Sequence, residues 1–257
     1  MGWSNQARVM ARQVYALRKH NLNADLHIHC LENPEAGTEG DLNQQAIYLR
    51  SICGAAVMKG LDIIGIVSHF SFEPGNICQH IIGEHDYDLH VMAGVEIKTA
   101  EGIPTIVYDA HTVPKNGEPI EQICQRAHQE GGSVMVIQPS KRNMQHLNKI
   151  AGQPISPDFI EMFNDMSRGG YAHTFVDVEA SPEYHLVVNS AATNPQELDR
   201  SVMMTRIPRD FLTERGILVE NQGVNYTPPY LENVRKQMPG QPTPTTQPGI
   251  PMLQGGL

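Results

Sequence analysis

Two hydrophobic patterns alternate along the chain between Asn23 and residue 216. Short runs that are almost wholly apolar predict strands buried on both faces. Longer segments with apolar residues three and four positions apart predict amphipathic helices. Strands are expected at 24–30, 61–67, 91–97, 105–108, 133–137, 159–163, 186–189 and 202–207. Helices are expected at 42–60, 118–130, 144–151, 195–200 and 209–216.

This alternation predicts parallel β/α units joined by right-handed crossovers. We therefore expect an α/β barrel domain over residues 23–220, and the length of 257 residues fits one such barrel. The spacing of Val9, Val14 and Leu17 predicts an amphipathic helix within residues 1–22. We expect this helix to cover the domain rather than to bind a membrane. Residues 221–237 are expected to form a C-terminal helical segment.

The last part of the chain, residues 238–257, has a different composition. From Pro239 onward it contains five Pro and four Gly and no charged side chain. Such a segment cannot build a hydrophobic core, so we expect an extended tail. Its expected role is to bind a protein partner or a second copy of the chain.

Charge and cysteine content narrow the class of protein. Lys and Arg number 19 and Asp and Glu 28, a net charge of −9, which argues against non-specific binding to nucleic acid. No apolar run reaches the roughly 20 residues that cross a membrane, and the N-terminus has no hydrophobic signal core. The four cysteines form no CxxC pair, which is typical of a reducing compartment. We expect a cytoplasmic protein.

Histidine, with 12 residues, marks the candidate chemistry. His27 and His29 are two positions apart, so they share one face of a strand. His69 and Glu96 end the next two predicted strands, and the carboxyl ends of barrel strands meet at one mouth. Imidazole and carboxylate ligands suit Zn, Mn or Fe. Each histidine alone is an ordinary hydrogen-bonded residue; four such residues at successive strand ends favour a common site.

These residues lie in motifs that resemble those of the PHP (polymerase and histidinol phosphatase) family of metal-dependent phosphoesterases. The family forms DLHxHT, TDH, GxE, HP, xIExxN and GSDAHxPEEL correspond, in order, to segments beginning at Asp25, Val67, Gly94, Gln138, Phe159 and Asn189. The ordered series covers about residues 23–208. The resemblance implies a distorted seven-stranded TIM-like β/α barrel that binds two or three metal ions.

The chain departs from the family pattern at several positions. The motif histidine of HP is Gln138, and the Asp and His of SDAH are Ala191 and Thr193. A further family histidine aligns with Thr105, and the Asp of TDH is Ser68. The resemblance therefore implies a depleted centre that holds one ion or none.

The surviving ligands can be assigned by the same resemblance. His27, His29 and Glu96 match three of the four ligands of one metal. His69 matches a ligand of another, with Glu35 as a candidate oxygen ligand in the first loop.

Other side chains could compensate for the lost ligands. Lys141 and Arg142 follow the strand that ends at residue 137 and are candidates for binding a phosphate. Asp109 and His111 follow the fourth strand and could add further donors at the same mouth.

Two functions follow from these expectations. One is a phosphoesterase that hydrolyses a small phosphorylated substrate with water activated by a metal at His27, His29 and Glu96. The alternative is a catalytically degenerate barrel that serves as a structural or interaction subunit of a larger assembly.

Overall fold

The computed structural model describes residues 21–33, 38–39, 42–85, 87–164, 183–195, 197–199 and 205–217. The chain divides into two compact units, Met1–Gly223 and Val224–Leu257, and every described residue belongs to the first. The expected N-terminal helix, the helical segment at 221–237 and the tail at 238–257 all lie outside the described residues.

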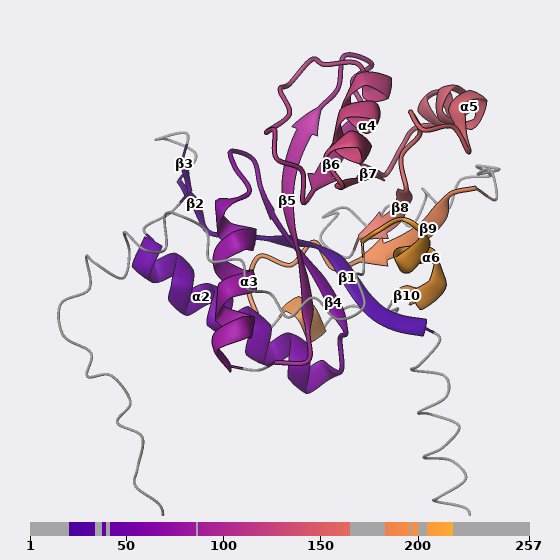
Figure 1. The fold of residues 1–257 in the computed structure, drawn as a ribbon. Coiled ribbons are helices and arrows are strands. Elements are labelled where there is room, and N and C mark those ends of the chain that lie inside the picture. Colours follow the sequence, from indigo (N-terminus) through magenta and orange to yellow (C-terminus); the bar gives the residue numbers. More distant parts are fainter. Residues whose placement is uncertain are drawn as a thin grey trace, which may run out of the picture. The chain divides into compact units, whose positions relative to one another are not determined.

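One eight-stranded sheet dominates the described part of the chain, in the order β10-β1-β4-β5-β6-β7-β8-β9 (Figure 1). Each strand overlaps a run predicted from the sequence. The bounds are Asn21–His29 (β1), Ile63–Ser68 (β4), His90–Lys98 (β5), Pro104–Tyr108 (β6), Ser133–Ile137 (β7), Phe159–Asn164 (β8), His185–Asn189 (β9) and Thr205–Pro208 (β10). Two short strands, β2 (Glu32–Asn33) and β3 (Thr38–Glu39), pair separately.

The sheet is mixed rather than parallel throughout. β6 runs antiparallel to both of its neighbours, and β10 runs antiparallel to β1. The other strands are parallel, so β1, β4, β5, β7, β8 and β9 end on the same side. The expected α/β barrel class is confirmed, as a nearly closed, distorted barrel. Its described sheet has the eight strands expected from the hydrophobic pattern, one more than the resemblance to the family implied.

Alternating side chains divide the core into an interior and an exterior. Leu26, Val67, Met92, Tyr108 and Met135 belong to one buried cluster that fills the barrel interior. Residues next to them in sequence pack outward, against the helices, in two further clusters. Gly65 faces the interior, where an added Cβ would lie 2.2 Å from the Leu26 carbonyl oxygen. The barrel therefore closes tightly around β1 and β4.

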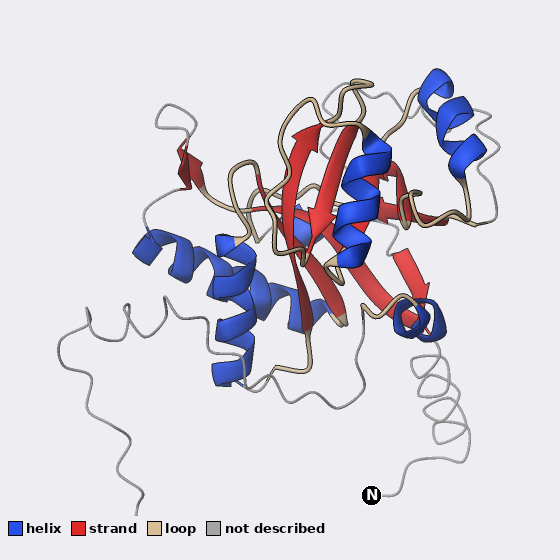
Figure 2. Ribbon diagram, turned by 45° about the horizontal axis from the view of Figure 1, so that its top comes forward, coloured by secondary structure: helices blue, strands red, loops and turns tan. Residues whose placement is uncertain are grey.

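The described helices cover the outside of the sheet. They are α2 (Leu42–Lys59), α3 (Glu73–His85), α4 (Ile120–Gln129), α5 (Lys141–Ile150) and α6 (Arg209–Glu214), with a 3-10 turn at Glu197–Asp199 where a helix was expected. Figure 2 shows α2 and α3 together on one part of the sheet and α4 on another. No described helix is long and apolar enough to cross a membrane.

α3 was not predicted, because its first turn contains Pro74-Gly75, a pair typical of turns. Proline is nevertheless tolerated in the first turn of a helix. A Cβ on Gly75 would lie 2.4 Å from the Cα of Ala93, so glycine allows α3 to pack directly on β5.

Side chains from β1 and β9 close the barrel. Asn189 Oδ1 accepts the Leu26 amide at 2.8 Å, and Asp25 Oδ1 accepts the Ser190 amide at 3.1 Å. A single backbone bridge joins Ile28 to Ala192. These contacts take the place of a regular ladder between the first and last parallel strands, and they lie next to the histidine pair.

Candidate metal centre

The two histidines of β1 face the barrel because of a β-bulge. The pairing of β1 with β4 shifts register between Asp25 and Ile28. Leu26 lies in the interior cluster, and regular alternation would then turn His27 outward. Instead Ile28 packs on the outer cluster beside the helices, so His27 and His29 turn inward. Bulges commonly redirect side chains beside functional sites in this way.

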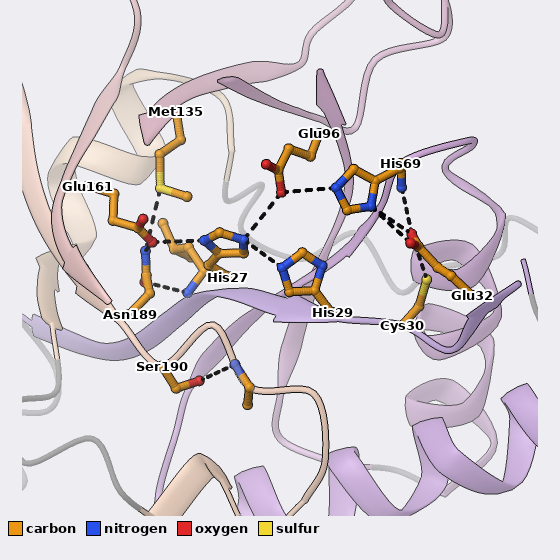
Figure 3. A network of polar contacts seen from close by, with 12 residues as sticks. His27, His29, Cys30, Glu32, His69, Glu96, Met135, Glu161, Asn189 and Ser190 are labelled. Carbon is orange, nitrogen blue, oxygen red and sulfur yellow. Dashed lines mark hydrogen bonds and ion pairs between the residues drawn. The ribbon is translucent and has the colours of Figure 1, made fainter. Parts of the chain in front are cut away.

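His27, His29 and Glu96 converge at the carboxyl ends of β1 and β5 (Figure 3). One ligand atom from each lies within 4.8 Å of the other two. His27 Nε2 is 3.1 Å from His29 Nε2 and 3.5 Å from Glu96 Oε2. These are the three residues that the sequence placed in one metal site, and the structure brings them together.

His69 extends this cluster towards the surface. Its Nε2 lies 3.7 Å from Glu96 Oε2, and its ring stacks on that of His29 with centroids 5.6 Å apart. Glu32 Oε2 lies 2.9 Å from His69 Nδ1, and Glu32 Oε1 accepts the His69 amide at 2.7 Å. Glu32 is therefore the loop carboxylate that hydrogen-bonds to His69, whereas the predicted Glu35 lies outside the described residues.

Behind His27, Glu161 meets its other ring nitrogen, and Asn189 in turn binds Glu161. His27 Nδ1 is 2.9 Å from Glu161 Oε1, and the Glu161 side chain is completely buried. Asn189 Nδ2 donates to the same oxygen at 2.8 Å. Figure 3 shows Glu161 and Asn189 on the side of His27 opposite His29 and Glu96. A carboxylate on the far nitrogen fixes the ring and makes the free nitrogen a better ligand.

His27, His29 and Glu96 differ in their protonation. Burial alone would lower the pKa of His27, but Glu161 and Glu96 outweigh it and raise that pKa to about 10. Burial and the neighbouring charge of His27 lower the pKa of His29 to about 4. The pKa of Glu96 is lowered, against the effect of burial, by its histidine neighbours. At neutral pH the cluster thus combines a cationic His27, a neutral His29 and an anionic Glu96.

The positions where the chain lacks a motif ligand keep an unusual backbone. Gln138 has φ 39° and Ala191 has φ 48°, values that are uncommon for residues other than glycine. The Gln138 Nε2 atom is buried and has no hydrogen-bond partner. Thr105 is fully buried and donates to the Ile103 carbonyl, and Thr193 binds Glu197. None of these four side chains supplies a nitrogen or carboxylate to the described His/His/Glu group.

The remaining candidates lie elsewhere or stay predictions. Because β6 is antiparallel, Asp109 follows it at the amino-terminal half of β5, where it accepts the Ala93 amide at 2.9 Å. The His111 amide donates to Glu130 at 2.7 Å. The expectation that these two residues join the mouth is wrong.

Lys141 and Arg142 are exposed in the first turn of α5, which follows β7, so phosphate binding there stays a prediction.

Three further polar residues of the site were not singled out from the sequence: Glu32, Glu161 and Asn189. Glu161 could have been found, because a carboxylate inside the apolar run Phe159–Phe163 is unusual in a buried strand. Glu32 and Asn189 carry no such signal, since polar residues are ordinary in a loop and at a strand end.

The donor set fits a divalent transition metal. Two imidazoles and one carboxylate, with open positions, are typical of catalytic zinc and of non-haem iron sites. Glu161 completes the carboxylate–histidine pair that such sites usually contain. His27, His29 and Glu96 are thus the described group that could hold such an ion.

No protein-family model matches the chain, and no curated protein matches it either. Among solved structures, the chain is similar to a putative metal-dependent phosphoesterase from Bifidobacterium adolescentis, at 12% sequence identity and a TM-score of 0.51. The match covers 76% of this chain and 97% of that one. The two proteins share a fold, which agrees with the resemblance to PHP phosphoesterases inferred from the motifs.

Two structures of endonuclease Q match less closely. One is the lesion-specific enzyme from Pyrococcus furiosus, with 15% identity, a TM-score of 0.45 and coverage of 70% of this chain. The other is a complex with a 27-mer duplex that carries an abasic lesion, with 14% identity, a TM-score of 0.41 and coverage of 68%. The chain spans about half the length of these enzymes, 51% and 50%.

Proposed function

We propose that this protein is a metal-dependent phosphoesterase that hydrolyses a small phosphorylated substrate at a reduced metal centre. The observation that carries the proposal is the convergence of His27, His29 and Glu96 within 4.8 Å at the barrel mouth. The shared fold with a metal-dependent phosphoesterase supports it. A bound divalent metal would polarise a phosphoryl oxygen and lower the pKa of a bound water.

The residues at the site would each have a distinct role. His29 Nε2 and His27 Nε2 point at the same space as Glu96 Oε2 and would act as the metal ligands. Glu161 would keep the proton on His27 Nδ1, so that Nε2 is the nitrogen that would give up its proton to a metal. His69, about half exposed and paired with Glu32, lies where it could exchange a proton with a substrate oxygen.

A centre of one ion fits this residue set better than a centre of three. Ala191, Thr105 and Gln138 stand where the resembled motifs have ligands, and alanine offers no donor at all. Glu32 and His69 add one oxygen and one nitrogen beside Glu96, so a weaker second site there is the largest extension that the described residues allow.

The test is metal loading combined with hydrolysis. Purified protein is incubated with Mn²⁺ or Zn²⁺, desalted and assayed for bound metal and for cleavage of p-nitrophenyl phosphate. We expect close to one tightly bound ion per chain and metal-dependent cleavage. His29→Ala and Glu96→Gln should each weaken metal binding by about tenfold or more and abolish cleavage. His80→Gln, which alters a histidine that pairs with Glu84 on α3, is the matched control and should change neither.

Less than about a tenth of an ion per chain after loading would contradict the proposal, because a ligand set of this kind binds transition metals tightly. Tight binding without cleavage of any phosphoester tested would instead favour the alternative of a degenerate barrel that acts as an interaction subunit.

A further inference from the structure

The geometry points to Asn189 as a positioning residue for the metal ligand His27. We propose that Asn189 joins the seam of the barrel to Glu161 and so fixes the His27 ring with Nε2 directed at the metal. The inference rests on the proposed function, because it assigns a role towards the metal proposed there. It goes further by coupling barrel closure to the orientation of a ligand.

Asn189 lies at the seam of the barrel. It is the last residue of β9, one of the two edge strands of the described sheet, and it is 1% exposed. Its Oδ1 accepts the Leu26 amide of β1 at 2.8 Å, so the side chain does what a neighbouring strand's carbonyl would do in a regular ladder. Leu26 directly precedes His27 at the bulge of β1.

The nitrogen of the same side-chain amide binds Glu161. Asn189 Nδ2 donates at 2.8 Å to Glu161 Oε1, the oxygen that lies 2.9 Å from His27 Nδ1. One carboxylate oxygen therefore receives both hydrogen bonds (Figure 3). Because the amide is held at both ends, it restricts how Glu161 can move, and Glu161 in turn restricts the tilt of the imidazole.

His27 needs such a restraint because it lies at the bulge of β1. At a bulge the ladder is interrupted, and the register of β1 with β4 is shifted at this point. The backbone ladder alone therefore does not fix the direction of His27. Side-chain contacts from β8 and β9 supply the missing restraint, and Asn189 is the residue that touches both β1 and Glu161.

Substitution Asn189→Asp isolates the link to Glu161. The variant keeps an oxygen for the Leu26 amide and nearly the same shape, but it replaces the donor to Glu161 with a second carboxylate oxygen. We expect the dissociation constant for Zn²⁺, measured by calorimetry, to rise by about tenfold, which is the size of effect typical of groups behind a metal ligand.

Thr205→Val is the matched control. Thr205 Oγ1 binds both the amide and the carbonyl of Val188 and so supports the same strand, β9, without contact to Glu161. We expect this variant to lose thermal stability while its Zn²⁺ affinity stays within about twofold. Equal losses of affinity in both variants would mean that Asn189 acts only through stability, and this would overturn the inference.

A double substitution keeps the test valid if Asn189→Asp folds poorly. When Asn189→Asp is combined with Glu161→Gln, one carboxylate and one amide remain at the two positions. Because Asn189 Nδ2 and His27 Nδ1 both meet Glu161 Oε1 in the native chain, the glutamine must rotate so that its amide donates to the aspartate while its oxygen accepts from His27 Nδ1. The pair keeps its net charge and its hydrogen bonds, with the polarity of one bond reversed. We expect the double variant to fold and to recover most of the lost affinity. If the loss of binding free energy in the double variant equals the sum of the losses in the two single variants, the coupling is contradicted.

A measurement on the metal-free protein separates this inference from the proposed function. The Nδ1 proton of His27 should give a protected downfield signal in ¹⁵N-edited NMR spectra. The signal should persist in Thr205→Val and disappear or exchange rapidly in Asn189→Asp. If the native chain binds no metal but shows this pattern, the proposed function fails and the positioning role stands. If metal binds and the signal is the same in all variants, the positioning role fails alone.

Discussion

Asp109 is a half-buried acid whose charge opposes folding. It follows β6 at the end of the barrel remote from Glu96, and its Oδ1 accepts hydrogen bonds from the Ala93 amide and from Gln79 Nε2. Burial raises the pKa of this carboxyl to about 6, although the two hydrogen bonds act in the opposite direction. The residue has φ 51°, a conformation that Asp and Asn accept better than most residues.

The raised pKa of Asp109 predicts that this residue's contribution to the free energy of unfolding falls as the pH rises. The folded state binds a proton more tightly than the unfolded state, whose pKa is 3.8, so this contribution to stability is complete below pH 4. It is lost as the pH rises towards 6. We expect Asp109→Asn, which keeps an oxygen acceptor and suits the same backbone, to remove this loss.

Urea unfolding of both proteins between pH 4 and pH 7 provides the measurement. The stability of the Asn variant relative to the native chain should increase over this range by about 1–2 kcal/mol, a value reduced from the full shift because the residue is partly exposed. A difference that is constant with pH would show that Asp109 titrates normally.

At the same scale, the candidate ligands were predictable from sequence while their supporting residues were not. His27, His29, His69 and Glu96 stand at the ends of apolar runs, so the topology of a barrel places them at one mouth. Glu32 and Asn189 are joined to the site by hydrogen bonds across 37 and 163 positions, to His69 and to Leu26. Contacts of that range depend on which strands become neighbours in the folded barrel, which no local pattern encodes.

At the scale of the element, the bulge in β1 determines which way the histidines face. Gly65 of β4 lies beside it, where an added Cβ would be 2.2 Å from the Leu26 carbonyl oxygen and 2.7 Å from the carbonyl carbon. Both atoms belong to the backbone, so they cannot move aside cheaply. A methyl group at this position must push β1 away from β4, one residue before His27.

We therefore expect Gly65→Ala to destabilise the protein by about 3 kcal/mol, the upper part of the range for overpacking, and to weaken metal binding as well. Gly83→Ala is the matched control, because Gly83 lies in α3 and a Cβ there would meet nothing within 4 Å. It should be neutral or stabilising by up to about 1 kcal/mol through helix propensity. Thermal unfolding of the two variants provides the measurement. Equal melting temperatures would refute the close approach of Gly65 to the Leu26 carbonyl.

The direction of β6 was available in the sequence, whereas the bulge was not. The strands expected at 91–97 and 105–108 are separated by only seven residues, and a parallel crossover needs a dozen or more. A hairpin was therefore the required connection, and it carries Asp109 and His111 away from the mouth. The bulge follows from the packing of β1 against β4 and β9, and the run Ala24–Cys30 gives no sign of it.

At the scale of the whole molecule, the roles of the described barrel and of the C-terminal residues 238–257 can be tested separately. The tail has five Pro, four Gly and no charge from Pro239 onward, so we do not expect it to contribute to a hydrophobic core. A chain that ends at residue 237 should keep its melting temperature to within about 2 °C, because that temperature depends on the surface buried by the core. It should also keep the metal content of the full chain.

The same truncation tests whether the tail mediates assembly. If the tail binds a partner or a second copy, the full chain should elute earlier than the truncated chain by more than its mass difference explains, or should capture a protein that the truncated chain does not. A full chain with residues 238–257 in scrambled order is the matched control, since its composition and length are unchanged. Identical elution and capture for all three proteins would remove the tail as the basis of an interaction subunit, and the metal centre would then be the only candidate for function that the chain offers among its described residues.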